Sequence, residues 1–151
     1  MADTVAVQWI YPPNMQDGQW DEKSGNRRVV ARLTGTSDGT GETDIAKIIL
    51  SDLKTPAGNI PQRTVVEWID WSVFGMSVKL EWDRTPNALI IDMNDIGFNN
   101  ATEDSGFRSW EQYGGLLDPG LDDGTGNIIL TSENGFSGDS YDITICLRLK
   151  D

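Results

Sequence analysis

Two Glu-Trp pairs, Glu67-Trp68 and Glu81-Trp82, flank a glycine almost symmetrically in EWIDWSVFGMSVKLEWD, residues 67–83. Glycoside hydrolases use paired carboxylates as acid and base, with the two carboxyl groups roughly 5–10 Å apart. The stretch therefore raises the question whether Glu67 and Glu81 form such a pair. The same residues also suit the rungs of an ordinary β-hairpin.

The alternation of apolar and polar residues favours the hairpin. A turn at residues 74–75 gathers the apolar side chains on one face and sets Asp70 opposite Lys79 on the other. In this register Glu67 faces Trp82's position and Glu81 lies on the opposite face of the sheet. The two carboxylates then cannot flank one glycosidic bond. The sequence therefore predicts a structural hairpin.

The six tryptophans raise sugar stacking as an alternative function. In the hairpin register Trp71 and Trp82 share the apolar face and are expected in the core. Trp20, Trp68 and Trp110 are the candidates for the surface. Aromatic residues outside a core mark protein interfaces more often than sugar platforms. The sequence thus favours a protein partner and keeps a glycan as the alternative.

The remaining composition removes most familiar catalytic chemistry. The chain has no histidine, which takes away the commonest general base, the usual zinc ligand and the Ser-His and Cys-His nucleophile systems. Cys146 is the single cysteine, so no intrachain disulfide or thiolate cluster can form. We expect a protein that is not an enzyme and that uses no cofactor.

Two acidic segments imitate calcium loops. Asp92, Asn94, Gly97 and Glu103 occupy positions one, three, six and twelve of the EF-hand spacing. The fifth position is an isoleucine without a side-chain oxygen, and a strand-like run stands where an EF-hand needs a helix. The aspartates of residues 118–123 are typical of turns. No metal site is predicted.

The formal net charge is −12, from 24 acidic and 12 basic residues. Such a surface repels phosphate backbones, so no nucleic-acid partner is expected. No apolar run approaches the roughly 20 residues that cross a bilayer, so no membrane partner is expected either. The N-terminal MADTVAVQWIYPP lacks the basic region and apolar core of a signal peptide. Folding in a cytoplasm is the expectation.

Period-2 alternation predicts short strands along most of the chain. Besides the hairpin, strands are expected in TVAVQWIY (4–11, with Val5, Val7, Trp9 and Tyr11 on one face), RRVVARLTG (27–35), ALIIDMN (88–94), GNIILTSE (126–133) and SYDITICLRLKD (140–151). TDIAKIILSDLK, residues 43–54, is ambiguous between strand and helix. About eight strands predict an all-β, antiparallel β-sandwich, of which the jelly roll is one form, as a single domain over residues 1–151.

Two segments break the alternation: an irregular arm at residues 12–26 and a long loop at residues 94–126. Long loops in compact domains are usually functional, part of an interface or disordered. A sandwich buries its alternating faces internally, which leaves irregular segments to carry recognition. The predicted partner-binding residues are of the types that anchor interfaces: Tyr11, Trp20, Phe98, Phe107, Arg108, Trp110 and Tyr113.

At its two ends, MADTVAVQWIYPP and GDSYDITICLRLKD, the chain resembles capsid decoration, or cement, proteins of tailed bacteriophages. Size, acidity, the all-β pattern and the C-terminal strand carry the resemblance. It implies a homotrimeric β-sandwich or jelly roll that is assembled in the host cytoplasm and binds the major capsid protein on the capsid exterior. The expected function is a non-enzymatic structural virion protein. The alternative is a carbohydrate-binding or host-recognition module of a head fibre or tail.

Overall fold

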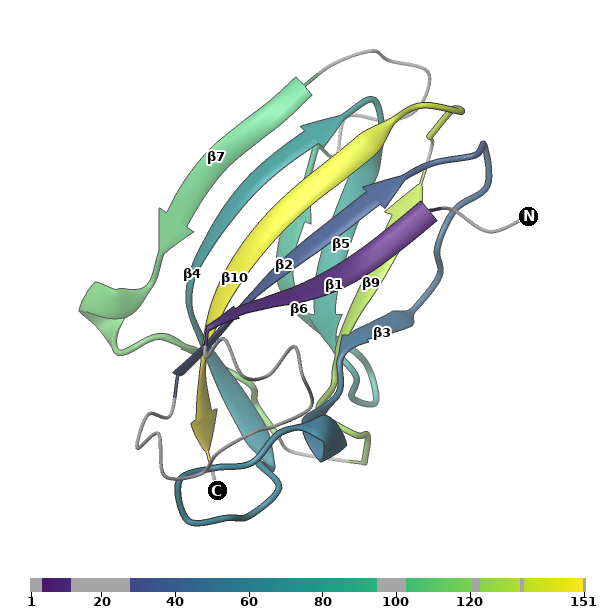
Figure 1. Ribbon diagram of the computed structural model, residues 1–151. Helices are drawn as coiled ribbons and strands as arrows, with labels where there is room; N and C mark the ends of the chain where they lie inside the picture. Colours follow the sequence, from purple (N-terminus) through teal and green to yellow (C-terminus); the bar gives the residue numbers. More distant parts are fainter. Residues whose placement is uncertain (1–3, 12–27, 95–102, 121–122, 134, 151) are drawn as a thin grey trace.

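The strands form two antiparallel sheets that pack face to face as a sandwich, in a computed structural model that describes residues 4–11, 28–94, 103–120, 123–133 and 135–150 (Figure 1). Sheet A has the order β1 (Thr4–Tyr11), β2 (Arg28–Thr36), β10 (Ser140–Lys150), β4 (Arg63–Phe74), β7 (Glu103–Ser109), with the short β8 (Leu116–Leu117) also beside β4. Sheet B has the order β3 (Ile45–Ile48), β9 (Ile128–Glu133), β5 (Ser77–Trp82), β6 (Ala88–Met93). The prediction of an antiparallel β-sandwich is confirmed, with ten strands in the described residues instead of about eight.

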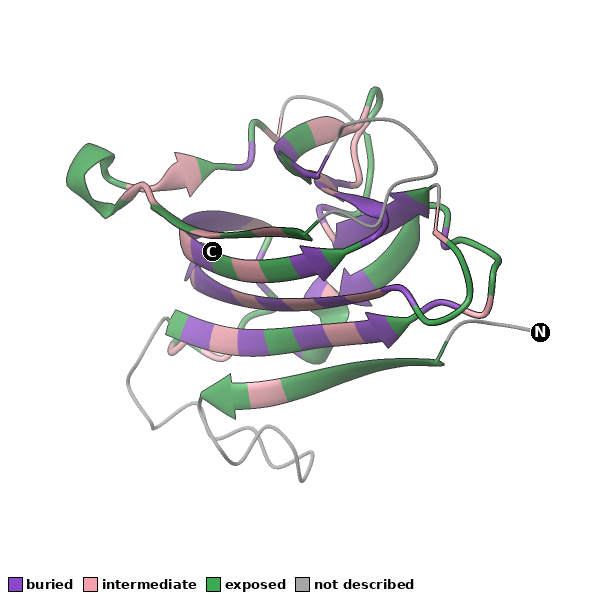
Figure 2. Ribbon diagram, turned by 90° about the horizontal axis from the view of Figure 1, so that it is seen from above, coloured by how far each residue is buried: buried purple, intermediate pink, exposed green. Residues whose placement is uncertain are grey.

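The core lies between the sheets because alternate residues of the central strands are apolar. In β2 and β10 the inward residues are fully or almost fully buried, and their neighbours are more exposed: Val29, Ala31, Leu33, Tyr141, Ile143, Ile145, Leu147 and Leu149. Figure 2 shows this alternation along the middle of sheet A. Both strands show the period-2 alternation that the sequence predicted, with Cys146 as an additional buried residue on the outer side of β10.

The predicted hairpin between β4 and β5 is wrong. β4 pairs with β10 and β7 in sheet A, whereas β5 pairs with β9 and β6 in sheet B. Gly75, at φ +79°, lets the chain cross from one sheet to the other. Alternation identifies the buried side of each strand. It cannot tell two strands that pair from two strands that face each other across a core.

The separation of the two sheets changes the positions of the hairpin's charged residues. Asp70 is not opposite Lys79; it lies beside Thr144 in sheet A, and Lys79 pairs with Glu81 in sheet B at 3.6 Å. Glu67 and Glu81 therefore belong to different sheets and form no acid–base pair.

The ambiguous segment at residues 43–54 is a strand followed by one turn of helix. β3 ends at Ile48, and the 3-10 helix η3 (Leu50–Asp52) follows directly. A second 3-10 helix, η4 (Glu111–Tyr113), follows β7. No helix in the described ranges is long and apolar enough to span a membrane.

The predicted loop at residues 94–126 contains an edge strand. β7 pairs with β4 along seven residues, so the description of this segment as irregular is wrong for Glu103–Ser109. Alternation did not predict this strand, because an edge strand does not need an apolar residue at every second position. Its Gly106 allows close approach, since an added Cβ would lie 2.7 Å from the Trp71 ring. The arm at residues 12–26 lies outside the described residues.

β1 forms the opposite edge of sheet A, and a bulge divides its apolar face. Trp9 pairs with Ala31, which faces the core, but Tyr11 pairs with Val30, which faces outward. The predicted common face therefore holds for Val5, Val7 and Trp9 and fails for Tyr11. An extra residue in a strand reverses the alternation beyond it.

Candidate binding surface

The outer face of sheet A is a broad surface with a polar centre. Residues directly opposite each other on neighbouring strands share a face. Two adjacent rows therefore run across β2, β10, β4 and β7: Arg32, Thr144, Asp70 and Phe107 in one, and Thr34, Asp142, Ser72 and Ser105 in the other. Hydroxyl, carboxylate and guanidinium groups thus stand within reach of one bound molecule.

An aromatic pair borders this polar centre. Trp68 on β4 and Phe107 on β7 have ring centroids 5.9 Å apart with an interplanar angle of 35°. They are diagonal neighbours, because Trp68 is opposite Ser109 and Phe107 is opposite Asp70. Trp68 is half-buried and Phe107 is 62% exposed. The pair can stack against an apolar side chain or the apolar face of a sugar ring.

An ion pair fixes the middle of the same surface. The guanidinium of Arg32 donates from Nε to one carboxylate oxygen of Asp142 at 3.0 Å and from a terminal nitrogen to the other at 2.6 Å. The hydrogen bond to Asp142, together with the negative charge of that carboxylate, raises the pKa of Arg32. Both side chains are almost half exposed, so the pair contributes little to stability. It presents oriented polar groups beside Asp70 and Ser72, in a hollow of about 190 Å³.

The segment that follows β7 projects beyond the edge of sheet A (Figure 1). We define the β7–η4 ridge as Phe107, Arg108, Trp110 and Tyr113. Trp110 packs partly against the core, and its backbone N–H donates to the carbonyl of Glu67 at 2.8 Å. The guanidinium carbon of Arg108 lies 6.0 Å from the centroid of the Trp110 ring. Tyr113 is 77% exposed at the tip. The ridge therefore combines an anchored base with exposed aromatic rings.

A charge cluster supports the base of the ridge. Glu67 occupies a bulge of β4 and is buried, and the Nε of Arg28 donates to its two oxygens at 3.0 and 2.9 Å. Arg148 lies 3.7 Å from the same carboxylate and donates to the carbonyl of Gly114 at 2.9 Å. The hydrogen bond to Glu67, together with the negative charge of that carboxylate, raises the pKa of Arg28. The cluster links β2, β4 and β10 to the turn behind η4, across a pocket of about 180 Å³ that Glu111 also lines.

Cys146 lies next to this cluster on the outer side of β10. It is buried, and it pairs across the sheet with Val30 and Trp68. Burial, with a smaller effect from the negative charge of Glu67, raises the pKa of the thiol to about 11. The thiol is therefore protonated at neutral pH and is a poor nucleophile.

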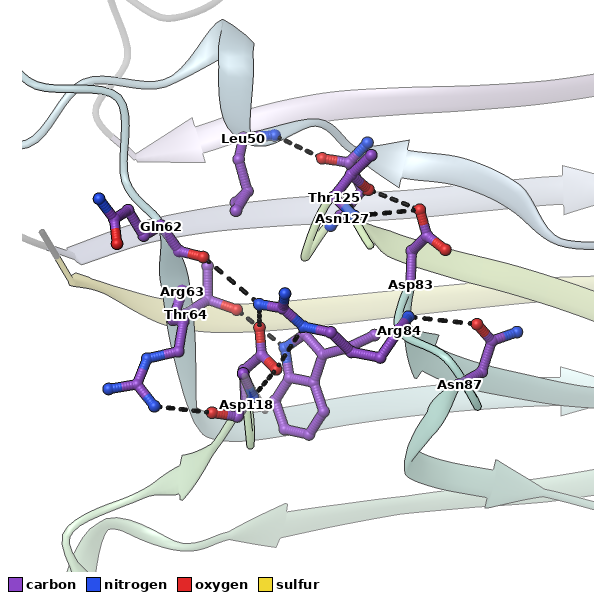
Figure 3. Close-up of polar contacts among 12 residues, drawn as sticks. Leu50, Gln62, Arg63, Thr64, Asp83, Arg84, Asn87, Asp118, Thr125 and Asn127 are labelled. Atoms are coloured by element: carbon purple, nitrogen blue, oxygen red, sulfur yellow. Dashed lines mark hydrogen bonds and ion pairs between the residues drawn. The ribbon is translucent and has the colours of Figure 1, made fainter. Parts of the chain in front are cut away.

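A second polar network closes one end of the sandwich. Figure 3 shows the guanidinium of Arg84 forked onto the carboxylate of Asp118, with Nε···O at 3.0 Å and a terminal nitrogen at 2.6 Å. Both side chains are almost completely buried. Asp118 also accepts from the backbone N–H of Gly120 at 3.0 Å, and Arg84 donates to the carbonyl of Gln62. Because each charge is satisfied within the network, we assign it a structural role.

The same end holds two further links. The indole N–H of Trp82 in sheet B donates to the hydroxyl of Thr64 in sheet A at 3.0 Å. The side-chain oxygen of Asn127 accepts from the backbone N–H of Leu50 at 2.9 Å (Figure 3). Trp82 is fully buried, as the sequence predicted, and Trp71 packs against the core with partial exposure.

Four of the seven predicted partner-binding residues lie in one continuous segment, the β7–η4 ridge, in which Phe107 is opposite the outward-facing Asp70 and Arg108 is opposite Ile69 on the other face of sheet A. Tyr11 lies on β1, at the opposite edge of sheet A, with three strands between. At about 4.8 Å per strand, this places it roughly 19 Å from β7. Trp20 and Phe98 lie outside the described residues.

The turn at the end of β6 is fixed by Asn94, one of the residues that imitate an EF-hand loop. Asn94 has φ +57°, its amide donates to the carbonyl of Met76 at 2.9 Å, and its backbone N–H donates to Asp104 at 2.8 Å. Among the residues placed by the structure, no three His, Cys, Asp or Glu side chains are grouped so as to hold a metal ion.

The charge cluster at Glu67 and the Arg84–Asp118 pair were missed by sequence reasoning. A signal existed for the first, since Glu67 interrupts the apolar run VVEWI and a glutamate is seldom buried without a partner. The identity of its partners depends on strand order, which alternation does not give. The Asp- and Gly-rich neighbours of Asp118 are typical of a turn, and nothing in them indicates an arginine partner 34 residues away.

In comparisons with known proteins, the chain matches no family model, no curated protein and no solved structure.

Proposed function

We propose that the protein is a non-enzymatic binding protein that attaches to a larger assembly through the β7–η4 ridge. The observation that carries the proposal is the ridge itself, where Phe107 is exposed on the edge strand β7 and Tyr113 is exposed in η4, the turn that projects beyond this edge. Aromatic and arginine side chains at the centre of an interface are the usual anchors of binding. The ridge supplies both kinds from four closely spaced residues.

The firm attachment of the ridge supports this role. Its base is fixed by the backbone hydrogen bond from Trp110 to Glu67 and by Arg148 at the carbonyl of Gly114. A surface that is ordered before binding loses less conformational entropy when the complex forms.

We propose the exterior of a phage capsid as the assembly, with the major capsid protein as the partner. The resemblance of the chain ends, the size and the acidity to capsid decoration proteins support this choice. In this role the protein would be made in the host cytoplasm, become part of the virion, and hold neighbouring capsid subunits together.

The test is to look for the protein on purified particles. Mass spectrometry should find the chain in virions of the source, and cryo-electron microscopy should place it on the capsid exterior. Absence from the particle contradicts the proposal. Particles stripped of the protein should then rebind the wild type, whereas Tyr113→Ala should bind at least roughly tenfold more weakly, because a central anchor typically contributes about 2 kcal/mol or more.

Phe136→Ala is the matched control. Phe136 is also an exposed aromatic residue, but it lies in the turn between β9 and β10, outside the ridge. Equal binding of Phe136→Ala and wild type, with loss in Tyr113→Ala, assigns the contact to the ridge.

A glycan is the second candidate ligand, because Trp68 and Phe107 form an aromatic pair beside the polar centre of sheet A. Sugar sites combine stacking rings with hydroxyl, carboxylate and guanidinium groups, and Asp70 and Arg32 supply the charged ones. Glycan arrays followed by calorimetry test this candidate. Phe107→Ala should abolish glycan binding and Tyr113→Ala should leave it intact, whereas capsid binding should suffer from both changes.

A further inference from the structure

Asp70 is an exposed acidic residue on the outer face of sheet A, and the described part of the chain gives it no counter-ion. Its side chain takes part in no hydrogen bond or ion pair there. Arg32, the cation in the same row of the sheet, is engaged by Asp142 at 2.6 Å. The carboxylate of Asp70 is therefore available to a bound molecule.

Two aromatic rings lie beside this carboxylate. Phe107 is directly opposite Asp70 on β7, and Trp68 precedes Asp70 by two residues on the same face of β4. The two strands lie side by side at the edge of sheet A (Figure 1). The ring centroids are 5.9 Å apart, and Phe107 is exposed. The carboxylate and the two rings therefore border one patch of surface.

Hydroxyl groups continue this patch on the side away from the rings. Thr144 is opposite Asp70 on β10, and Ser72 follows Asp70 on the same face of β4. These three side chains line the hollow of about 190 Å³. A ligand that donates hydrogen bonds thus finds acceptors on three sides.

The combination of groups favours a cation. The face of an aromatic ring carries a partial negative charge, so the rings and the carboxylate attract a cation jointly, whereas a neutral ligand gains only stacking from the rings. The guanidinium group of arginine is planar and can stack on a ring while its N–H groups donate to a carboxylate. The fold already contains both halves of this arrangement. Arg32 donates to Asp142 through two nitrogens, and Arg108 lies 6.0 Å from the centroid of the Trp110 ring.

We propose that an arginine side chain of the protein partner binds at this site, the Asp70 patch, which consists of Asp70, Trp68, Phe107, Ser72 and Thr144. Charge complementarity selects this occupant, because a chain with a net charge of −12 attracts a basic segment and repels an acidic one. The guanidinium stacks on the exposed ring of Phe107 and donates to the carboxylate of Asp70.

The inference rests on the proposed function, because Phe107 belongs to both the β7–η4 ridge and the Asp70 patch. It extends the contact from the ridge onto the outer face of sheet A. It also specifies the chemistry of the partner, which must present an exposed arginine.

The test is a nuclear magnetic resonance titration of the full chain with a capped glycine-arginine-glycine peptide as the probe. At millimolar concentrations the peptide should shift the amide signals of Asp70, Ser72 and Thr144 and the indole signal of Trp68. A peptide with citrulline in place of arginine has nearly the same shape without the charge, and it should leave these signals unchanged.

Asp70→Asn should weaken binding of the arginine peptide by at least roughly fivefold, because it removes the charge that the guanidinium meets. The fold should not change, since Asp70 is exposed and supports no other described side chain. Asp52→Asn is the matched control. Asp52 is an exposed aspartate of η3 whose side chain also has no partner among the described residues, and its replacement changes the net charge equally. This variant should bind the peptide like the wild type.

The inference is overturned if the arginine peptide leaves the sheet A signals unmoved, or if the citrulline peptide shifts them equally. Equal losses in Asp70→Asn and Asp52→Asn would show attraction to net charge alone and overturn it as well. Oligosaccharides that shift the same signals, where the arginine peptide does not, would make the patch a sugar site instead.

Particle binding separates this inference from the proposed function. On stripped particles Asp70→Asn should bind more weakly than Asp52→Asn. If Tyr113→Ala loses binding and Asp70→Asn retains it, the ridge is the contact and the arginine site is wrong. If the chain is absent from the particles, the capsid proposal fails, and the peptide titration still decides whether the Asp70 patch binds arginine.

Discussion

At the scale of single residues, Glu67 is the side chain on which the ridge depends. It is buried, it accepts hydrogen bonds from Arg28, and it lies near Arg148. Its backbone carbonyl also accepts from Trp110. A residue whose type and neighbours suggested acid catalysis instead forms ion pairs with two guanidinium groups and positions the turn behind the proposed binding surface.

Glu67→Gln keeps the shape of the side chain and removes its charge. Loss of one partner from a fully buried ion pair costs roughly 3–5 kcal/mol, but Arg28 and Arg148 are partly hydrated, so we expect a loss of about 1–3 kcal/mol. Urea denaturation followed by circular dichroism measures it. Glu81→Gln, whose carboxylate is 3.6 Å from Lys79, should cost less than about 1 kcal/mol. Equal losses in the two variants would contradict the role given to Glu67.

The thiol of Cys146 makes stability depend on alkaline pH. Burial raises its pKa from the ordinary 9.0 to about 11, so the folded state holds the proton more tightly than the unfolded chain. The stabilisation is fully present below pH 9 and is lost as the pH rises from about 9 to about 11. Denaturation curves at several pH values should show wild type losing stability relative to Cys146→Ala over this interval. A constant difference between the two proteins would show that the thiol titrates normally.

At the scale of elements, two consecutive glycines fold the segment after η4 back onto sheet A. Gly114 has φ +82° with open space around its Cα, whereas Gly115 has φ +94° and lies against the side chain of Val65. Both positions favour glycine because other residues rarely adopt positive φ. Gly115 has the additional requirement of close contact with β4.

Alanine substitutions separate these two requirements. Gly114→Ala should cost about 1–2 kcal/mol from backbone strain. Gly115→Ala adds a clash with Val65, so it should cost about 2–5 kcal/mol in total and weaken hydrogen-exchange protection of β8. Denaturation curves measure the loss of stability in each variant, and hydrogen exchange followed by mass spectrometry measures the protection of β8. If the two variants lose the same stability, the segment does not pack on Val65 as the structure has it.

The sequence predicted the positions of the strands better than it predicted which strands pair with each other. Alternation located β1, β2, β6, β9 and β10 to within two residues at each end, because buried faces require it. It failed for β7, an edge strand whose polar residues need no buried face, and for the partners of β4 and β5. Residue type alone selected the ridge residues and Tyr11 as one predicted binding set, but their separation depends on strand order, which arises from the packing of the whole chain.

At the scale of the whole molecule, the two sheets are joined at one end by buried polar bonds as well as by the core. Trp82 of sheet B donates to Thr64 of sheet A, and Arg84 reaches from the end of β5 to Asp118, which follows β8 in sheet A. Apolar packing alone allows two sheets to slide, since the hydrophobic effect is non-directional. Directional bonds between them fix one alignment, and with it the position of the outer face of sheet A.

Asp118→Asn tests this connection. Asp118 is fully buried, and its carboxylate holds both the Arg84 guanidinium and the Gly120 N–H, so the change leaves a buried cation without its counter-ion. We expect a loss of about 3–5 kcal/mol and a lower thermal midpoint by calorimetry, with a single transition because the bond joins both sheets. Asp142→Asn is the matched control. It removes the same charge from an equally short arginine pair that is almost half exposed, and it should cost less than about 1 kcal/mol. A loss confined to the loops around Gly120, with the midpoint of the sheets unchanged, would show that the pair is local and that the core alone aligns the sandwich.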